Sequence, residues 1–149
     1  MQEKPFTIYV VDDDPSIRRA LKRLLGSVGY HTLTFDSAEA LLEFPLVQGQ
    51  GCLLLDIRLP GMSGFDLQER LSSKGPKYPI LFMTAHDNPQ WRERAKQTGA
   101  VAFLKKPFLE NKLLEAIRRC CVREASPSNL QHSVTTGRVG NVLEKCDAG

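Results

Sequence analysis

Four short apolar runs, each ending at a residue that can do chemistry, constrain the fold of this chain more than any other feature. The runs are Ile8–Val11, Cys52–Leu55, Ile80–Met83 and Val101–Leu104. They are followed, in that order, by Asp12 and Asp13, by Asp56, by Thr84, and by Lys105 and Lys106. Short apolar runs that alternate with helical patterns are typical of buried parallel strands. Because ligands bind outside the carboxyl ends of such strands, we expect these polar groups to converge in one crevice.

Helix-start and helix-end signals occupy the segments between the runs. Asp14 before Pro15 predicts an N-cap followed by proline at the first helical position, and Gly29 can terminate that helix. Further helix starts are predicted at Ser37, at Ser63-Gly64-Phe65-Asp66 and at Asn88-Pro89, with a second strand over Tyr30–Phe35 and a last helix over Leu109–Cys121. This alternation predicts an α/β fold with right-handed crossovers, but it does not determine the order of the strands.

Composition limits the classes of function. A chain of 149 residues with 42% hydrophobic and 25% charged residues is ordinary for one globular domain. It contains no apolar run of about 18 residues and no signal-peptide pattern at Met1, so we expect a cytoplasmic protein away from membranes. The four cysteines show no zinc-binding spacing. A net charge of +3 is too small to predict direct binding of nucleic acid.

The last segment, residues 125–149, differs from the rest. It is rich in Ser, Thr, Asn and Gly and has no aromatic residue. We therefore expect a domain over residues 1–124 followed by a disordered tail. A segment this short cannot build the core of a DNA-binding domain, so output through protein contacts is expected.

Motifs at the ends of the apolar runs resemble those of a known family. They are Val11-Asp12-Asp13, Leu55-Asp56, the loop Leu59–Gly64, Met83-Thr84-Ala85 and Lys106-Pro107-Phe108. Over roughly residues 5–122 the chain resembles the receiver domain of two-component response regulators. The Asp56 loop and Gly99-Ala100-Val101 are most similar to nitrogen-fixation-type regulators. The resemblance implies a flavodoxin-like, doubly wound, five-stranded parallel sheet of order 2-1-3-4-5 with five helices.

The three carboxylates suggest a magnesium site. Packed carboxylates repel one another and raise each other's pKa unless a cation lies between them, and hard oxygen ligands suit Mg²⁺. The resemblance implies that Asp13, Asp56 and the backbone carbonyl of Arg58 contact the ion. Asp12 would then act largely through water. The alternative is an acidic cluster that complements a helix dipole, which explains Asp14 better than Asp12 or Asp13.

The resemblance assigns Asp56 as the acceptor of a phosphoryl group from a sensor histidine kinase. A carboxylate is a known nucleophile, and phosphoryl transfer needs mainly positioning and charge neutralisation. Lys106 matches the family's lysine because it directly precedes Pro107, and the resemblance also implies a cis bond between these two residues. Lys105 is then expected to be a surface residue. The implied activity is signalling, with at most self-phosphorylation from small donors and slow self-dephosphorylation.

The same resemblance implies a conformational switch. Thr84 would bind a phosphoryl oxygen, and Phe103 would turn inward as Thr84 moves. The responding face would be the fourth helix, fifth strand and fifth helix, which could form a homodimer or bind a downstream effector. Arg58 and His86, each two residues after a site residue, would border the path of the water that removes the phosphoryl group. Otherwise Phe103 is an ordinary core aromatic, and Arg58 and His86 are loop residues.

Three other classes of protein remain open. Asp12-Asp13-Asp14-Pro15-Ser16 loosely fits the first motif of haloacid-dehalogenase-type phosphatases, but it leaves Asp56 without a role. A flavodoxin would share the fold, but its phosphate-binding loop could not be triply acidic. A degenerate receiver that serves only as an interaction scaffold would not need an intact site.

Overall fold

Five strands alternate with five helices in the computed structural model, which describes residues 6–46, 50–74, 78–86 and 88–124. The strands are β1 (Thr7–Val11), β2 (His31–Phe35), β3 (Gly51–Asp56), β4 (Ile80–Thr84) and β5 (Ala102–Lys105). The helices are α1 (Pro15–Ser27), α2 (Ala38–Glu43), α3 (Gly64–Lys74), α4 (Pro89–Gln97) and α5 (Glu110–Glu124). All neighbouring strands are parallel, in the order β2-β1-β3-β4-β5, which confirms the predicted flavodoxin-like sheet.

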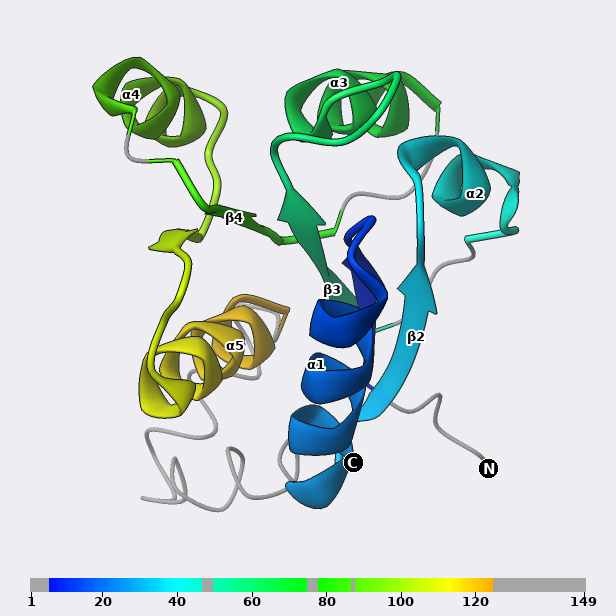
Figure 1. The fold of residues 1–149 in the computed structure, drawn as a ribbon, viewed down its shortest axis with the longest axis vertical. Coiled ribbons are helices and arrows are strands. Elements are labelled where there is room, and N and C mark those ends of the chain that lie inside the picture. Colours follow the sequence, from blue (N-terminus) through cyan, green and yellow to red (C-terminus); the bar gives the residue numbers. More distant parts are fainter. Residues whose placement is uncertain (1–5, 47–49, 75–77, 87, 125–149) are drawn as a thin grey trace.

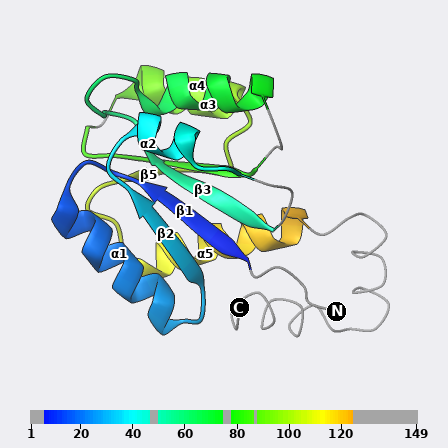
Figure 2. The same ribbon diagram turned by 90° about the vertical axis from the view of Figure 1, so that its right-hand side faces the viewer.

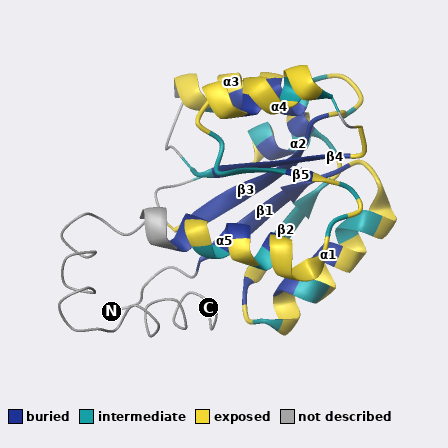
Figure 3. Cartoon of the chain, turned by 90° about the vertical axis from the view of Figure 1, so that its left-hand side faces the viewer, coloured by how far each residue is buried: buried dark blue, intermediate teal, exposed yellow. Residues whose placement is uncertain are grey.

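The sheet is covered on both faces, which explains why its central strands are continuously apolar. Helices α1 and α5 lie on one face and α2, α3 and α4 on the other (Figures 1 and 2). Every residue of β1, β3 and β4 is buried, and successive side chains enter opposite layers. Ile8 and Val10 pack with α1 and α5, whereas Tyr9 and Val11 pack in the second layer. Figure 3 shows the buried strands between helices whose outer surfaces are exposed.

The predicted helix caps are present. The side chains of Asp14, Ser37 and Asn88 each accept a hydrogen bond from a backbone N–H in the first turn of their helix. Ser63 and Asp66 form a reciprocal pair, with each side chain accepting from the other residue's backbone N–H at 3.1 and 3.2 Å. These short-range bonds place each helix start beside the carboxyl end of the preceding strand.

Two strand boundaries differ from the prediction by one residue. Tyr30 lies outside β2 because its N–H donates to the Leu25 carbonyl at the end of α1, after Gly29 has turned the chain with φ 96°. Strand β5 runs one residue later than predicted because Lys105 pairs with Thr84. The last helix also extends beyond Cys121, to Glu124. For the two strands, a capping hydrogen bond or the pairing with a neighbouring strand decides the boundary.

The predicted tail, residues 125–149, lies outside the described residues. Within the part of the chain that the structure describes, no helix combines the length and the apolar character needed to cross a bilayer.

Two helical glycines should respond in opposite ways to alanine. A Cβ at Gly64 would lie 2.5 Å from the backbone oxygen of Asp56, whereas a Cβ at Gly26 would meet no atom within 4 Å. Gly64→Ala should therefore lower the free energy of unfolding by about 1–3 kcal/mol through overpacking. Gly26→Ala, the matched control, should raise it by about 0.5–1 kcal/mol through helix propensity. Urea unfolding measures both, and a stabilised Gly64→Ala variant would contradict the close packing of α3 on β3.

Candidate functional site

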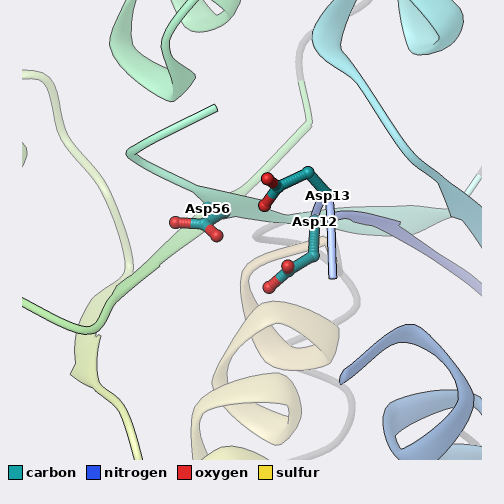
Figure 4. A group of neighbouring side chains, drawn as sticks. All are labelled: Asp12, Asp13 and Asp56. Carbon is teal, nitrogen blue, oxygen red and sulfur yellow. The ribbon is translucent and has the colours of Figure 1, made fainter. Parts of the chain in front are cut away.

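Three carboxylates meet at the carboxyl ends of β1 and β3. Val11 pairs with Leu55 across these parallel strands, so the residues that follow them, Asp12 and Asp56, lie side by side. Asp13 comes next in the chain and turns toward the same point (Figure 4). One oxygen from each of the three carboxylates lies within 4.8 Å of the others. The predicted acidic crevice is therefore formed by two adjacent strands.

Lys106 closes the crevice from the end of β5. Its ammonium donates hydrogen bonds to Oδ2 of Asp12 at 2.6 Å and to Oδ2 of Asp56 at 3.0 Å. The bond from Lys106 to Pro107 is cis, as the resemblance implied, and Lys105 is exposed. Of the two candidate lysines, Lys106 is therefore the one that reaches the acids.

The remaining carboxylate oxygens are bound unequally. Oδ1 of Asp12 accepts from the backbone N–H of Asp14 at 2.9 Å, and Oδ1 of Asp56 accepts from that of Arg58 at 3.2 Å. Asp13 is exposed, and no described residue donates a hydrogen bond to its carboxylate or pairs with it. Among the three acids, Asp13 is thus the one whose oxygens are available to an added ligand.

The pKa of Asp56 is raised from its ordinary value of 3.8 to about 6. Burial is the largest cause, because a desolvated carboxyl group favours the neutral form. Hydrogen bonding and charge attraction from Lys106 oppose the rise, and repulsion from Asp12 adds to it. Repulsion between the acids is therefore present but is not the largest cause, and the ammonium of Lys106, which contacts both buried acids, opposes the rise.

The ammonium of Lys106 responds to the same contacts. Burial works to lower its pKa, but the hydrogen bonds to Asp12 and Asp56 outweigh burial and raise the pKa above its ordinary value of 10.5. Lys106 is therefore a permanent cation in the crevice at neutral pH.

The donor set fits a hard divalent cation. Carboxylate oxygens near a crevice open to solvent are the ligands that Mg²⁺ accepts, together with several retained waters. Asp13 offers such oxygens without competition, because no described residue donates a hydrogen bond to its carboxylate. Asp12 and Asp56 each already accept hydrogen bonds on both oxygens within the protein, so an ion bound to Asp56 would share that carboxylate with Lys106 and the Arg58 N–H. The backbone carbonyl of Arg58 as a ligand stays a prediction.

Arg58 and His86 form a bridge across the rim of the crevice. The Arg58 guanidinium lies 2.9 Å from Nε2 of His86, and both side chains are exposed. The backbone N–H of His86 donates to the hydroxyl of buried Thr84 at 3.1 Å. The loop after β4 thus repeats the loop after β3, where the N–H of Arg58 donates to Asp56. The sequence singled out both residues by position but could not show that they touch.

Phe103 lies on the same face of the sheet as Thr84. It pairs with Phe82 in the neighbouring strand, two residues before Thr84. Its ring is half-buried, and the Arg92 guanidinium of α4 lies 4.8 Å from the ring centre. The structure therefore brings Phe103 to the sheet face that carries Thr84.

Sequence reasoning missed two further features. The Arg18 guanidinium donates to the backbone carbonyl of Asp12 at 2.7 Å and ties α1 to the acidic loop. A cavity of about 570 Å³ extends from Asp13 to Trp91 and Arg94 of α4. Neither feature has a sequence signal. A basic residue in a polar helix usually faces solvent, and a cavity depends on how separate elements pack.

Comparison with known proteins gives the family. The response regulator receiver domain family matches residues 8–118. Nodulation protein W of Bradyrhizobium diazoefficiens is 39% identical over 127 residues, which make up 85% of this chain and 56% of that protein. The transcriptional regulatory protein FixJ of the same organism is 38% identical over 127 residues, 85% of this chain and 62% of that protein. A structure of the response regulator StyR has a TM-score of 0.77 at 41% identity and covers 93% of this chain and 69% of that one.

The chain therefore belongs to the response regulator receiver domain family, and its relatives support the nitrogen-fixation-type group. This is a family of signalling domains. The chain therefore does not belong to the phosphatase or flavodoxin families that the sequence left open as alternatives. The chain spans little more than half the length of these two curated relatives.

The raised pKa of Asp56 predicts a specific dependence of stability on pH. The folded state holds this proton more tightly than the unfolded state does. The group's contribution therefore favours folding at low pH and is lost as pH rises through about 6. Asp56→Asn removes this dependence, so its stability relative to wild type should increase between about pH 4.5 and about pH 7.5. Urea unfolding without added metal measures the difference, and a constant difference would contradict the raised pKa.

Proposed function

We propose that this receiver domain accepts a phosphoryl group on Asp56 and uses it as a signal. The observation that carries the proposal is the ammonium of Lys106, which contacts both buried acids, Asp12 and Asp56. A protein that serves only as an interaction scaffold does not require a buried carboxylate (Asp56), a fixed ammonium (Lys106) and an exposed carboxylate (Asp13) in the same crevice. A pKa of about 6 leaves Asp56 mostly ionised at neutral pH and available as a nucleophile.

The proposed step is a displacement at phosphorus. An oxygen of Asp56 forms a bond to phosphorus while the bond to the donor's nitrogen or oxygen breaks. The bonding electron pair leaves with the donor, which takes a proton from solvent where it needs one. Lys106 holds Asp56 in place and supplies a positive charge near the transferred oxygens.

Asp13, Asp56 and the backbone carbonyl of Arg58 would bind Mg²⁺ directly. Asp12 would act on the ion largely through water. When bound, Mg²⁺ would neutralise the carboxylates and the charge of the phosphoryl oxygens. Exposed Asp13 supports an ion at this point, because its carboxylate is open to solvent, whereas Asp12 and Asp56 already accept hydrogen bonds within the protein.

Phosphorylation would shift an equilibrium between two conformations. Thr84 would hydrogen-bond a phosphoryl oxygen and give up its contact with the His86 N–H. Phe103, on the same sheet face, would move into the space that Thr84 leaves. Differential contacts of this kind are what a ligand needs in order to favour one conformation.

The bridge between Arg58 and His86 would lengthen the life of the aspartyl phosphate. Each residue is anchored by its backbone to a site residue, Asp56 or Thr84, and the two side chains meet over the rim. A closed rim restricts the approach of the water that attacks phosphorus. We assign self-dephosphorylation to this slow water attack rather than to a dedicated base.

The proposed donor is a sensor histidine kinase in the cytoplasm, with small acyl phosphates as substitutes. The proposed output is a protein contact, either with a second copy through α4, β5 and α5 or with a downstream effector. The described residues carry no helix that could cross a membrane.

Asp56 should be the acceptor. After incubation with acetyl phosphate and Mg²⁺, intact mass spectrometry should show one added phosphoryl group on the wild type and none on Asp56→Asn. Asn keeps the size of the side chain but lacks the nucleophilic carboxylate. Asp14→Asn, which changes an exposed cap outside the crevice, is the matched control and should be phosphorylated like wild type. Phosphate on Asp56→Asn at the wild-type level would sink the assignment.

Binding of Mg²⁺ should depend on Asp13. Asp13→Asn should weaken it by at least about tenfold in calorimetry, because a charged oxygen ligand is lost while the shape is kept. The same change reduces repulsion in the crevice, so the melting temperature without metal should stay the same or rise. Asp14→Asn is again the control, and an Mg²⁺ affinity unchanged by Asp13→Asn would exclude Asp13 as a ligand.

Breaking the rim bridge should shorten the half-life of the aspartyl phosphate. Arg58→Ala and His86→Ala should each accelerate its loss by about two- to tenfold, the equivalent of one hydrogen bond. The double variant should lose it no faster than the single variants, because all three break the same bridge. Arg19→Ala, an exposed change on α1, is the control. Additive effects of the two single changes would mean that the residues act separately.

A further inference from the structure

Arg92 covers the ring of Phe103. Its guanidinium carbon lies 4.8 Å from the ring centre, within the range of a cation–π contact. Phe103 belongs to β5, the edge strand of the sheet, and is half-buried. Arg92 belongs to α4, which lies over this edge and shows a mostly exposed surface in Figure 3. The ring is therefore held between the second core layer and a charged side chain.

The geometry suits a reversible hold. An arginine can lie flat on an aromatic ring while its charge stays hydrated, so the contact favours a ring near the surface over a fully buried one. Helix α4 has one buried residue, Ala95, and half-buried Trp91 packs beside it against the second core layer. A contact of this size biases the population of ring positions without restricting the ring to one of them.

We propose that Arg92 is a positioning residue that holds Phe103 in its half-buried position until the site is phosphorylated. The inference rests on the proposed function, because it names a residue that sets the balance of that switch. Inward movement of the ring separates it from the guanidinium, so the switch must overcome this contact. The movement also frees the Arg92 guanidinium to take another position on the surface of α4. Phosphorylation in the crevice would thereby change the charge distribution on the exposed face of this helix.

A second arginine on the same helix provides the internal comparison. The Arg94 guanidinium lies 4.4 Å from the ring centre of Phe65. That ring is buried, with 2% exposure, and packs against Phe82 at 4.7 Å between ring centres. Phe65 therefore has no more buried position to move to. Loss of Arg94 removes a cation–π contact on the same helix, together with the ion pair to Glu69, without releasing Phe103.

The test follows the environment of Phe103 in the full chain without any phosphodonor. The protein is labelled with 4-fluorophenylalanine, and Phe103→Leu identifies the resonance. The solvent isotope shift of that ¹⁹F resonance, between H₂O and D₂O, reports the exposure of the ring. It is measured for wild type, Arg92→Met, Arg92→Lys and Arg94→Met, with circular dichroism as the check of folding.

The proposal predicts a change of definite sign. In Arg92→Met the isotope shift should fall, because the ratio of inward to half-buried ring rises by about two- to fivefold. Arg92→Lys, which keeps a weaker cation over the ring, should lie between Arg92→Met and wild type. Arg94→Met should match wild type.

Two results would overturn the proposal. An isotope shift that stays constant or rises in Arg92→Met would mean that the ring does not move when the guanidinium is lost. An equal fall in Arg94→Met would mean that any change on α4 has this effect. Failure of Asp56 to accept phosphate is a separate outcome, seen by mass spectrometry, and leaves the ring measurement intact.

Discussion

The hydrogen bonds from Lys106 to Asp12 and Asp56 are the contacts on which the site depends. They join parts of the chain that lie 94 and 50 residues apart. Two buried carboxylates at neighbouring strand ends would destabilise the fold if left uncompensated, because breaking a buried ion pair costs about 3–5 kcal/mol. The cation at the end of β5 removes most of that penalty, and it does so where a phosphoryl group would need positive charge. Stability and proposed chemistry therefore rest on the same ammonium.

The site has a buried floor and an exposed rim with different physical roles. Asp12, Asp56 and Thr84 belong to the floor, which the parallel strands hold rigidly. The Arg58–His86 bridge belongs to the rim, which is exposed and carried by the loops after β3 and β4. A rigid floor suits positioning of the reacting atoms, whereas a loop-borne rim can open and close. Arg92 extends this division to α4, where a surface charge is coupled to a core aromatic.

The sequence predicted most of the architecture because its signals are local. Alternation of apolar runs with capped helical segments indicates parallel strands, and the side chains of Asp14, Ser37 and Asn88 cap helices where predicted. Boundaries were less accurate. Tyr30 reads as a strand residue by its apolar ring, but its N–H belongs to the end of α1. The strand propensity of Tyr30 does not predict this hydrogen bond, which forms only because Gly29 turns the chain with a positive φ.

By itself, the sequence determined that two strand-end acidic segments, Thr84 and one of two adjacent lysines reach the crevice, because side chains that follow buried parallel strands must emerge at one edge of the sheet. It did not determine what they touch there. The choice of Lys106 over Lys105 came from resemblance alone, and the structure explains it by the pairing of Lys105 with Thr84, after which the next side chain turns toward the acids. The contacts of Arg18, Arg58 and Arg92 were decided only by tertiary structure. A sequence predicts long basic side chains to be exposed to solvent. Their actual partners depend on the positions of loops and helices in the folded protein, which the local sequence does not determine.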